Sequence, residues 1–126
     1  MESIIIVGDK EVKMRASALI PRLYRFKFGR DIIKDITILK KAFAKASNLP
    51  ENATEEEKED AQLSALDLTI FENVAYIMAK HADKNQPETP DEWLDQFDMF
   101  SIYQVLPQIL TLWNLSTAMT SIPKNG

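Results

Sequence analysis

The 126-residue chain contains no cysteine, which excludes disulfide bonds and thiolate metal sites. It has only three glycines, and neither GxGxxG nor GxxxxGK(S/T), the motifs that cradle phosphate groups, occurs in it. No apolar run approaches the roughly 18 residues of a membrane span, and the apolar segment 4–7 is too short for the core of a signal peptide. We therefore expect a single intracellular globular domain, residues 1–126, that uses no cofactor.

The net charge of −4 conceals an uneven distribution along the chain. Residues 1–45 carry 11 basic and 5 acidic side chains, whereas residues 46–126 carry 4 basic and 14 acidic ones. Two interpretations stay open. Either the two halves fold together and offset each other's charge, or the molecule is polar and its potential steers association with copies of itself or with a charged partner.

Residues 3–15 predict a β-hairpin, because β-branched and alternating segments flank Gly8-Asp9, a two-residue sequence that suits a type II′ turn. The residues expected to share one face are Ile5, Val7, Val12 and Met14. Ile4 and Ile6 then lie on the opposite face, where water would meet two isoleucines. A lone hairpin is marginal in water, so we expect another strand or another subunit to cover or extend this one.

The remainder, residues 18–119, predicts a compact helical body of about four to five helices, since helix-favouring residues are common and glycine is scarce. Pro21 is tolerated only in a first turn, so the first helix begins at 18–20 and ends at Gly29. Its apolar stripe consists of Leu19, Leu23 and Phe26. The fold class is therefore mainly α with a small N-terminal β-hairpin (α+β).

Capping signals place the later helices. Asp31 caps a helix that breaks at Leu49-Pro50, and Thr54 opens a capping box that starts a long helix. The residues predicted to be buried along that long helix are Leu63, Leu66, Ile70, Val74, Ile77 and Met78. Thr89 opens a second capping box before a short helix. The last helix begins at 98–101, is kinked or restarted at Pro107, and leaves residues 120–126 as a frayed tail.

Few residues suggest catalysis or metal binding. His81 is the only histidine, and we interpret it as a polar residue at a helix end rather than as a ligand or general base. The acidic run 55–60 lacks the alternating ligands of a calcium loop. The basic segment that contains Arg22, Arg25 and Arg30 suits an acidic protein partner or a solvated face better than DNA, because the whole chain is acidic.

The last helix is apolar on more than one face, so it must be buried, either in the protein's own core or against a partner. Ile109, Leu112 and Trp113 are the candidate partner contacts there, because tryptophan is enriched at binding hot spots. We expect binding rather than catalysis, and a protein that is not an enzyme.

Three segments carry a resemblance to a known family: Asp91-Glu92-Trp93-Leu94-Asp95, Val105-Leu106-Pro107-Gln108-Ile109-Leu110-Thr111-Leu112-Trp113, and Thr120-Ser121 with Lys124. Their order, and the strand pair, basic helix and acidic middle that precede them, resemble the tail assembly chaperones of long-tailed phages and prophages of Gram-positive bacteria. No single one of these motifs is specific by itself.

The resemblance implies a non-enzymatic protein that binds the tape measure protein in the host cytoplasm. It would keep that long helical chain soluble while tail tube subunits polymerise around it, and it would be absent from the mature virion. The tail tube protein is a second candidate partner, and a homo-oligomer is a further expectation; nucleic acid and membrane are not expected partners. Two alternatives stay open: a small head-to-tail joining protein or structural adaptor, and a small nucleic-acid-binding regulator.

Overall fold

A β-hairpin and six helices make up residues 1–121, the part of the chain that this computed structural model describes; the side chains of residues 60 and 117–121 are not described. The elements are β1 (Glu2–Val7), β2 (Lys10–Arg15), α1 (Ile20–Phe28), α2 (Ile32–Ser47), α3 (Glu55–Ala61), α4 (Ala65–Ala82), α5 (Pro90–Leu94) and α6 (Ile102–Ser121). The predicted fold class is confirmed. The helices number six because the predicted long helix is divided in two.

The hairpin has the predicted register, with Ile5 opposite Val12. Gly8 has a φ of 63°, and Asp9 does not have a positive φ, which fits a type II′ turn. The side chains of Ile5 and Val12 point into the core, whereas Ile4 remains 54% exposed on the other face. Alternation of side chains along a strand explains why the sequence pattern predicts this arrangement.

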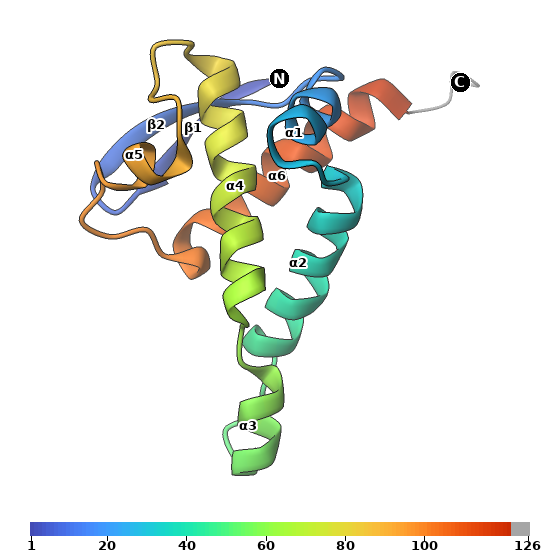
Figure 1. The fold of residues 1–126 in the computed structure, drawn as a ribbon. Coiled ribbons are helices and arrows are strands. Elements are labelled where there is room, and N and C mark those ends of the chain that lie inside the picture. The colour runs from blue at the N-terminus through green and yellow to red at the C-terminus, as the bar shows by residue number, and fades with distance from the viewer. Residues whose placement is uncertain (122–126) are drawn as a thin grey trace.

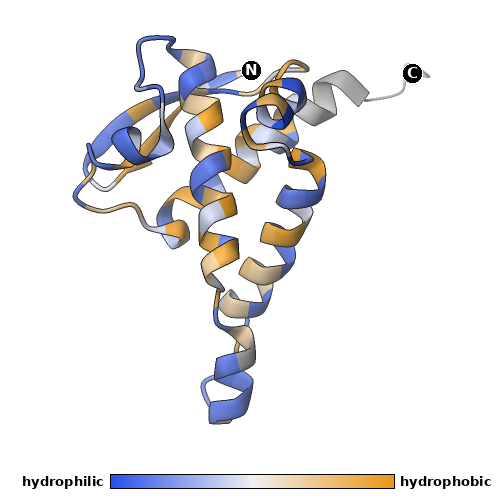
Figure 2. Ribbon diagram, viewed as in Figure 1, coloured by the Kyte–Doolittle hydropathy of each residue, from blue (hydrophilic) through white to orange (hydrophobic). Residues whose placement is uncertain are grey.

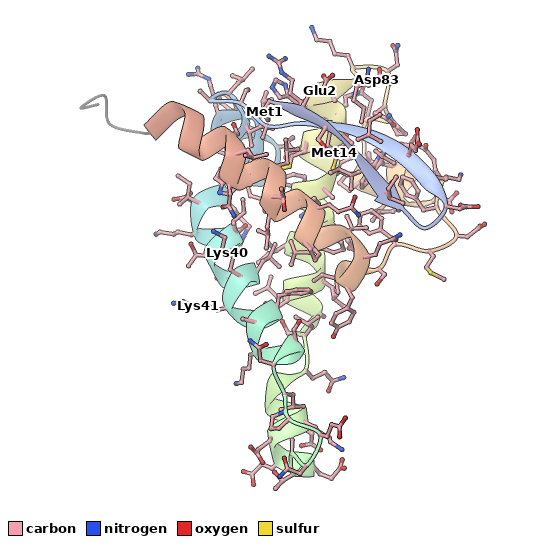
Figure 3. All side chains as sticks on the ribbon, turned by 180° about the vertical axis from the view of Figure 1, so that it is seen from behind. Met1, Glu2, Met14, Lys40, Lys41 and Asp83 are labelled. Carbon is pink, nitrogen blue, oxygen red and sulfur yellow. The ribbon has the colours of Figure 1, made fainter. Side chains whose placement is uncertain are left out.

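Helix α4 runs through the middle of the molecule and organises the fold (Figure 1). It packs against β2, α1, α2, α5 and α6, while β1 packs mainly against α6. Figure 3 shows from behind how α6 runs across β1 and on toward α2. The hydropathy colouring of Figure 2 shows apolar positions on the sides of α2 and α4 that face each other. One continuous core therefore joins the hairpin to the helices.

The predicted helix boundaries near Gly29, Asp31 and Thr54 are confirmed. Gly29 ends α1 with a φ of 68°, a left-handed conformation that glycine adopts without steric cost. The carboxylate of Asp31 accepts a hydrogen bond from the backbone N–H of Ile33, which begins α2. Thr54 forms a complete capping box with Glu57 at the start of α3.

The prediction of one long helix after Thr54 is wrong. Gln62 has an extended backbone, and Ser64 opens a second capping box with Asp67, so α4 begins as a separate helix. As a consequence, Leu66 lies in the first turn of α4 and is 55% exposed, not buried. Helix α3 projects from the body (Figure 1).

Helix α6 is continuous through Pro107, so the predicted alternative of a restart at that residue is wrong. Helix α6 extends to Ser121, and residues 122–126 lie outside the described part of the chain, so the predicted frayed tail at 120–126 stays a prediction. None of the helices within residues 1–121 combines the length and the hydropathy that a membrane crossing requires.

Candidate functional site

Most of the predicted apolar stripe of α1 lies at the surface, and only Leu23 packs against the core. Ile20 and Tyr24, on the other side of this helix, are fully buried, whereas Leu19 is 45% and Phe26 is 73% exposed. Leu23, the middle member of the stripe, is half-buried. A nine-residue helix with apolar residues on two sides can turn only one of them to the core, so the other forms a surface.

This surface borders a groove between α1 and the last turns of α4. The groove consists of two adjoining hollows of about 370 Å³ and about 330 Å³ that share Leu23, Ile77 and Lys80. We call it the α1–α4 groove; its lining residues are Arg15, Leu19, Leu23, Phe26, Lys27, Tyr76, Ile77, Lys80, His81, Lys84 and Glu88. It offers an apolar floor from two helices, which suits a partner with an apolar stripe of its own.

The rim of the groove is basic. Arg22 lies over the Phe26 ring at 5.3 Å, and the Nζ of Lys27 lies 5.8 Å from the centre of the Tyr76 ring. Lys80 is engaged internally, because its Nζ donates to the backbone carbonyl of Gln86 at 2.7 Å and pairs with the Glu88 carboxylate at 3.2 Å. Among the side chains that the structure describes, no carboxylate lies within salt-bridge distance of the other cations on this rim, Arg15, Arg22, Lys27 and Lys84. The groove therefore carries excess positive charge.

His81 lines the groove as a neutral group. Its Nε2 lies 2.8 Å from the hydroxyl oxygen of Ser17. Partial burial lowers the pKa of His81 below its ordinary value of 6.5, and the nearby cations Arg15, the terminal ammonium and Lys84 lower it further. Among the described residues, no group of three His, Asp or Glu side chains is arranged to hold a metal ion.

The predicted hairpin contacts Ile4 and Ile6 are exposed, at 54% and 39%. Beside them, a shallow hollow of about 300 Å³ between β1 and α6 is lined by Met1, Ile4 and Leu115, among other residues. The predicted outer face of the hairpin thus exists as an apolar surface. The expected covering strand or subunit stays a prediction.

Two of the predicted partner contacts on the last helix are core residues. Ile109 is completely buried and Leu112 is 2% exposed, because this side of α6 packs against β1 and α4. Trp113 is partly buried and also packs against the core. The prediction that Ile109 and Leu112 contact a partner is therefore corrected: α6 is apolar on several sides chiefly because it completes the protein's own core.

The three arginines predicted as partner contacts differ in their surroundings. Arg22 and Arg25 are exposed on α1. Arg30 instead forms a bidentate pair with Asp35, through Nε to Oδ2 and Nη2 to Oδ1, both at 2.8 Å. Arg30 therefore joins the turn after α1 to α2, and its side chain stays 42% exposed, so its role as a partner contact stays a prediction.

The sequence interpretation did not single out Leu19, Leu23 and Phe26 as a binding surface. The signal was present, since Ile20 and Tyr24 form a second apolar pair at helical spacing on the same short helix. Deciding which of the two faces the core requires the position of α4.

Comparisons of the chain with protein-family models, with curated proteins and with solved structures found no match in any of the three.

Proposed function

We propose that this protein is a non-enzymatic tail assembly chaperone of a long-tailed phage or prophage, and that it binds the tape measure protein and keeps it soluble in the host cytoplasm. The observation that supports this function best is the α1–α4 groove, where Leu19, Leu23 and Phe26 stand at the surface beside a basic rim. A small module that coats a long helical client needs such an apolar surface.

The client segment that the groove fits is an amphipathic helix with acidic residues beside its apolar stripe. The apolar side chains of the client would contact Leu23 and Ile77, and its carboxylates would meet cations such as Arg15, Lys27 and Lys84. Burial of exposed apolar side chains supplies most of the binding free energy in such complexes. The charges would select acidic helices over basic ones.

Co-expression with the tape measure protein encoded in the same gene cluster tests this proposal. The Leu19→Glu/Phe26→Glu variant changes two exposed groove residues, so we expect it to fold normally. It should lower the amount of co-purified tape measure protein about tenfold or more, because loss of central apolar side chains weakens other protein–protein complexes by a similar factor. Leu66→Glu, at a similarly exposed leucine in the first turn of α4, is the matched control and should bind like the unchanged protein.

A gene cluster without a tape measure reading frame, or equal binding by the groove variant and the unchanged protein, would overturn the proposal. Quantitative mass spectrometry of purified virions separates it from the structural-adaptor alternative, because a chaperone is lost from the finished particle and an adaptor stays. DNA binding with a steep salt dependence would instead favour the regulator.

A further inference from the structure

The two edges of the hairpin differ in their hydrogen bonding to the rest of the chain. On the outer edge of β1, the side-chain amide of Gln104 accepts from the backbone N–H of Gly8 at 2.7 Å, and the amide of Gln108 accepts from that of Ile6 at 2.9 Å. The same two amides donate to the carbonyls of Gly8 and Ile6, at 3.2 Å and 2.9 Å. Helix α6 thus occupies part of this edge in place of a strand.

The outer edge of β2 is open. The register pairs Val12 with Ile5, and backbone groups alternate in direction along an antiparallel strand, so Glu11 and Lys13 turn their N–H and C=O groups away from β1. No hydrogen bond joins these outward groups to any other residue in the described part of the chain. An open edge of this kind is a template for another strand.

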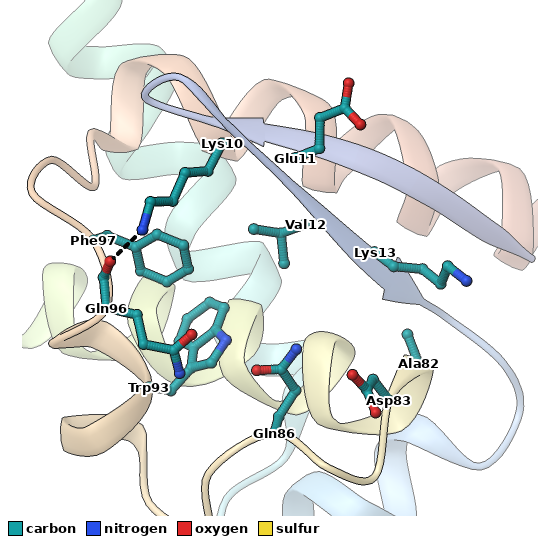
Figure 4. A pocket seen from close by; sticks show the side chains of 10 residues that line it. All are labelled: Lys10, Glu11, Val12, Lys13, Ala82, Asp83, Gln86, Trp93, Gln96 and Phe97. Carbon is teal, nitrogen blue, oxygen red and sulfur yellow. Dashed lines mark hydrogen bonds between the residues drawn. The ribbon is translucent and has the colours of Figure 1, made fainter.

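A cavity of about 460 Å³ lies directly beside this edge, below the position that a third strand would take (Figure 4). We call it the β2 slot; its lining residues are Lys10, Glu11, Val12, Lys13, Ala82, Asp83, Gln86, Trp93, Gln96 and Phe97. The Nζ of Lys10 donates to the backbone carbonyl of Gln96 at 2.8 Å and closes one end. None of these residues lines the α1–α4 groove, so the two sites are separate.

Trp93 supplies an independent sign that this slot receives a ligand. Its side chain is fully buried and packs edge-on against the rings of Tyr76, Phe97 and Phe100. The indole Nε1 nonetheless has no hydrogen-bond partner among the described residues. Figure 4 shows this nitrogen on the side of the ring that faces Gln86 across the cavity. A buried donor without an acceptor is energetically unfavourable, and an acceptor that enters the slot would offset this cost.

We propose that an extended, acidic peptide segment of another protein binds along β2 as a third strand of the sheet. Its backbone pairs with Glu11 and Lys13, and alternate side chains point down into the β2 slot, where an amide or hydroxyl oxygen accepts from Trp93 Nε1. Acidic residues on its outward face lie near Lys13, which has no carboxylate within salt-bridge distance among the side chains that the structure describes. Backbone pairing gives affinity and the slot gives selectivity.

A second copy of the chain does not fit this edge as well as a peptide does. Antiparallel pairing of β2 with β2 of another copy around a two-fold axis would put the helices of both copies on one face of the joined sheet. That layer is already occupied around the slot by α5, which contains Trp93, and by Gln96 and Phe97, which follow α5. A peptide brings no helices of its own, so it enters without this collision.

The experiment uses the whole chain and a short synthetic probe peptide. Every second residue of the probe is Asp or Glu, and the residues between them are, in order, Val, Asn and Val. Titration with a fluorescent form of the probe gives the dissociation constant, and the indole N–H resonance of Trp93 in ¹⁵N NMR spectra reports the contact inside the slot. We expect saturable binding and a shift of that resonance. The same probe with methylated backbone nitrogens on its pairing side should bind at least about tenfold more weakly.

Lys13→Pro removes the outward N–H of the edge without removing a bond to β1, and should weaken probe binding about tenfold or more. Lys13→Gln, which keeps this N–H and loses only the charge, should bind more tightly than the proline variant. The groove variant Leu19→Glu/Phe26→Glu should bind the probe normally, so failure of this proposal is distinguishable from failure of the proposed function. Equal binding of the methylated and unmethylated probes, no binding up to about 1 mM, or an unmoved Trp93 resonance would overturn it.

Discussion

Asp35 is the one charged side chain in the described part of the chain that is almost fully buried, with 2% of it exposed. Its carboxylate accepts hydrogen bonds from the hydroxyl of Tyr24 at 2.8 Å and from the guanidinium of Arg30. Burial alone would raise the pKa of Asp35, but the hydrogen bonds from Arg30 and Tyr24 outweigh burial and hold this pKa below its ordinary value of 3.8. The ionised carboxylate therefore fastens α1 to α2.

Asp35→Asn should lower the free energy of unfolding by about 1.5–3 kcal/mol near neutral pH, because it removes hydrogen bonds to a charged acceptor. The pKa of Asp35 is depressed in the folded state, so its contribution is present above pH 3.8 and is lost as the pH falls through the folded-state pKa. Urea unfolding at several pH values measures both effects. At acidic pH, the free energy of unfolding of the variant should fall less steeply with decreasing pH than that of the unchanged protein.

Arg25→Gln, at an exposed arginine of the same helix, is the matched control and should change stability little. If Asp35→Asn has the same free energy of unfolding as the unchanged protein, with the same dependence on acidic pH, the carboxylate does not hold the two helices together.

At the scale of elements, α6 acts as a substitute for a strand. Gln104 and Gln108 are four residues apart, so their side chains leave the same side of the helix and reach Gly8 and Ile6 of the hairpin. Each amide both donates and accepts, as a backbone peptide group in a sheet does. This arrangement protects one edge of the hairpin and leaves the other for a partner.

The Gln104→Ala/Gln108→Ala variant should lose about 1 kcal/mol of stability for each amide. Hydrogen exchange of the Ile6 and Gly8 amides, followed by NMR, should become faster than that of the Ile5 amide, which pairs with β2. Gln104→Glu/Gln108→Glu is a matched control that keeps the accepting oxygens and loses the donors, so it should retain more protection than the alanine variant. Unchanged exchange at Ile6 and Gly8 in the alanine variant would contradict this role of α6.

At the scale of the whole molecule, charge is separated along its length. The acidic helix α3 projects from the body on the far side from α1, while the basic rim of the α1–α4 groove lies beside α1 (Figure 1). The projecting acidic helix and the basic rim give the molecule an uneven potential, and both interpretations of the uneven charge stay open. Long-range potential of this kind changes association rates more than the lifetime of a complex.

Arg22→Glu/Arg25→Glu should therefore slow association with an acidic helical client by about tenfold at low ionic strength. The difference from the unchanged protein should shrink between about 0.1 M and about 1 M salt, because screening shortens the reach of the field. Stopped-flow measurements of client binding give the association rate at each salt concentration. Lys41→Glu/Lys45→Glu, at two exposed lysines of α2, is a control with the same change in net charge. Equal slowing by both variants would contradict steering by the groove.

Local rules account for the parts of the fold that the sequence predicts. The hairpin register follows from alternation around Gly8-Asp9, and the ends of α1 and α2 follow from Gly29 and Asp31, because turns and caps depend on neighbouring residues alone. The division between α3 and α4 also has a local signal in Ser64 and Asp67. The apolar periodicity nonetheless continues across the break, so the pattern predicts one helix.

Residue pattern alone predicts that this chain is mainly helical, begins with a hairpin and distributes its charge unevenly. The packing of distant segments decides which apolar residues meet the protein's own core: Ile109 and Leu112 do, whereas Leu19 and Phe26 do not. It also decides that α6 closes one edge of the hairpin and that Trp93 lies beneath the other. Periodicity places residues on a face of a helix, but the segment that covers the face is distant in sequence, so its identity is a property of the packing.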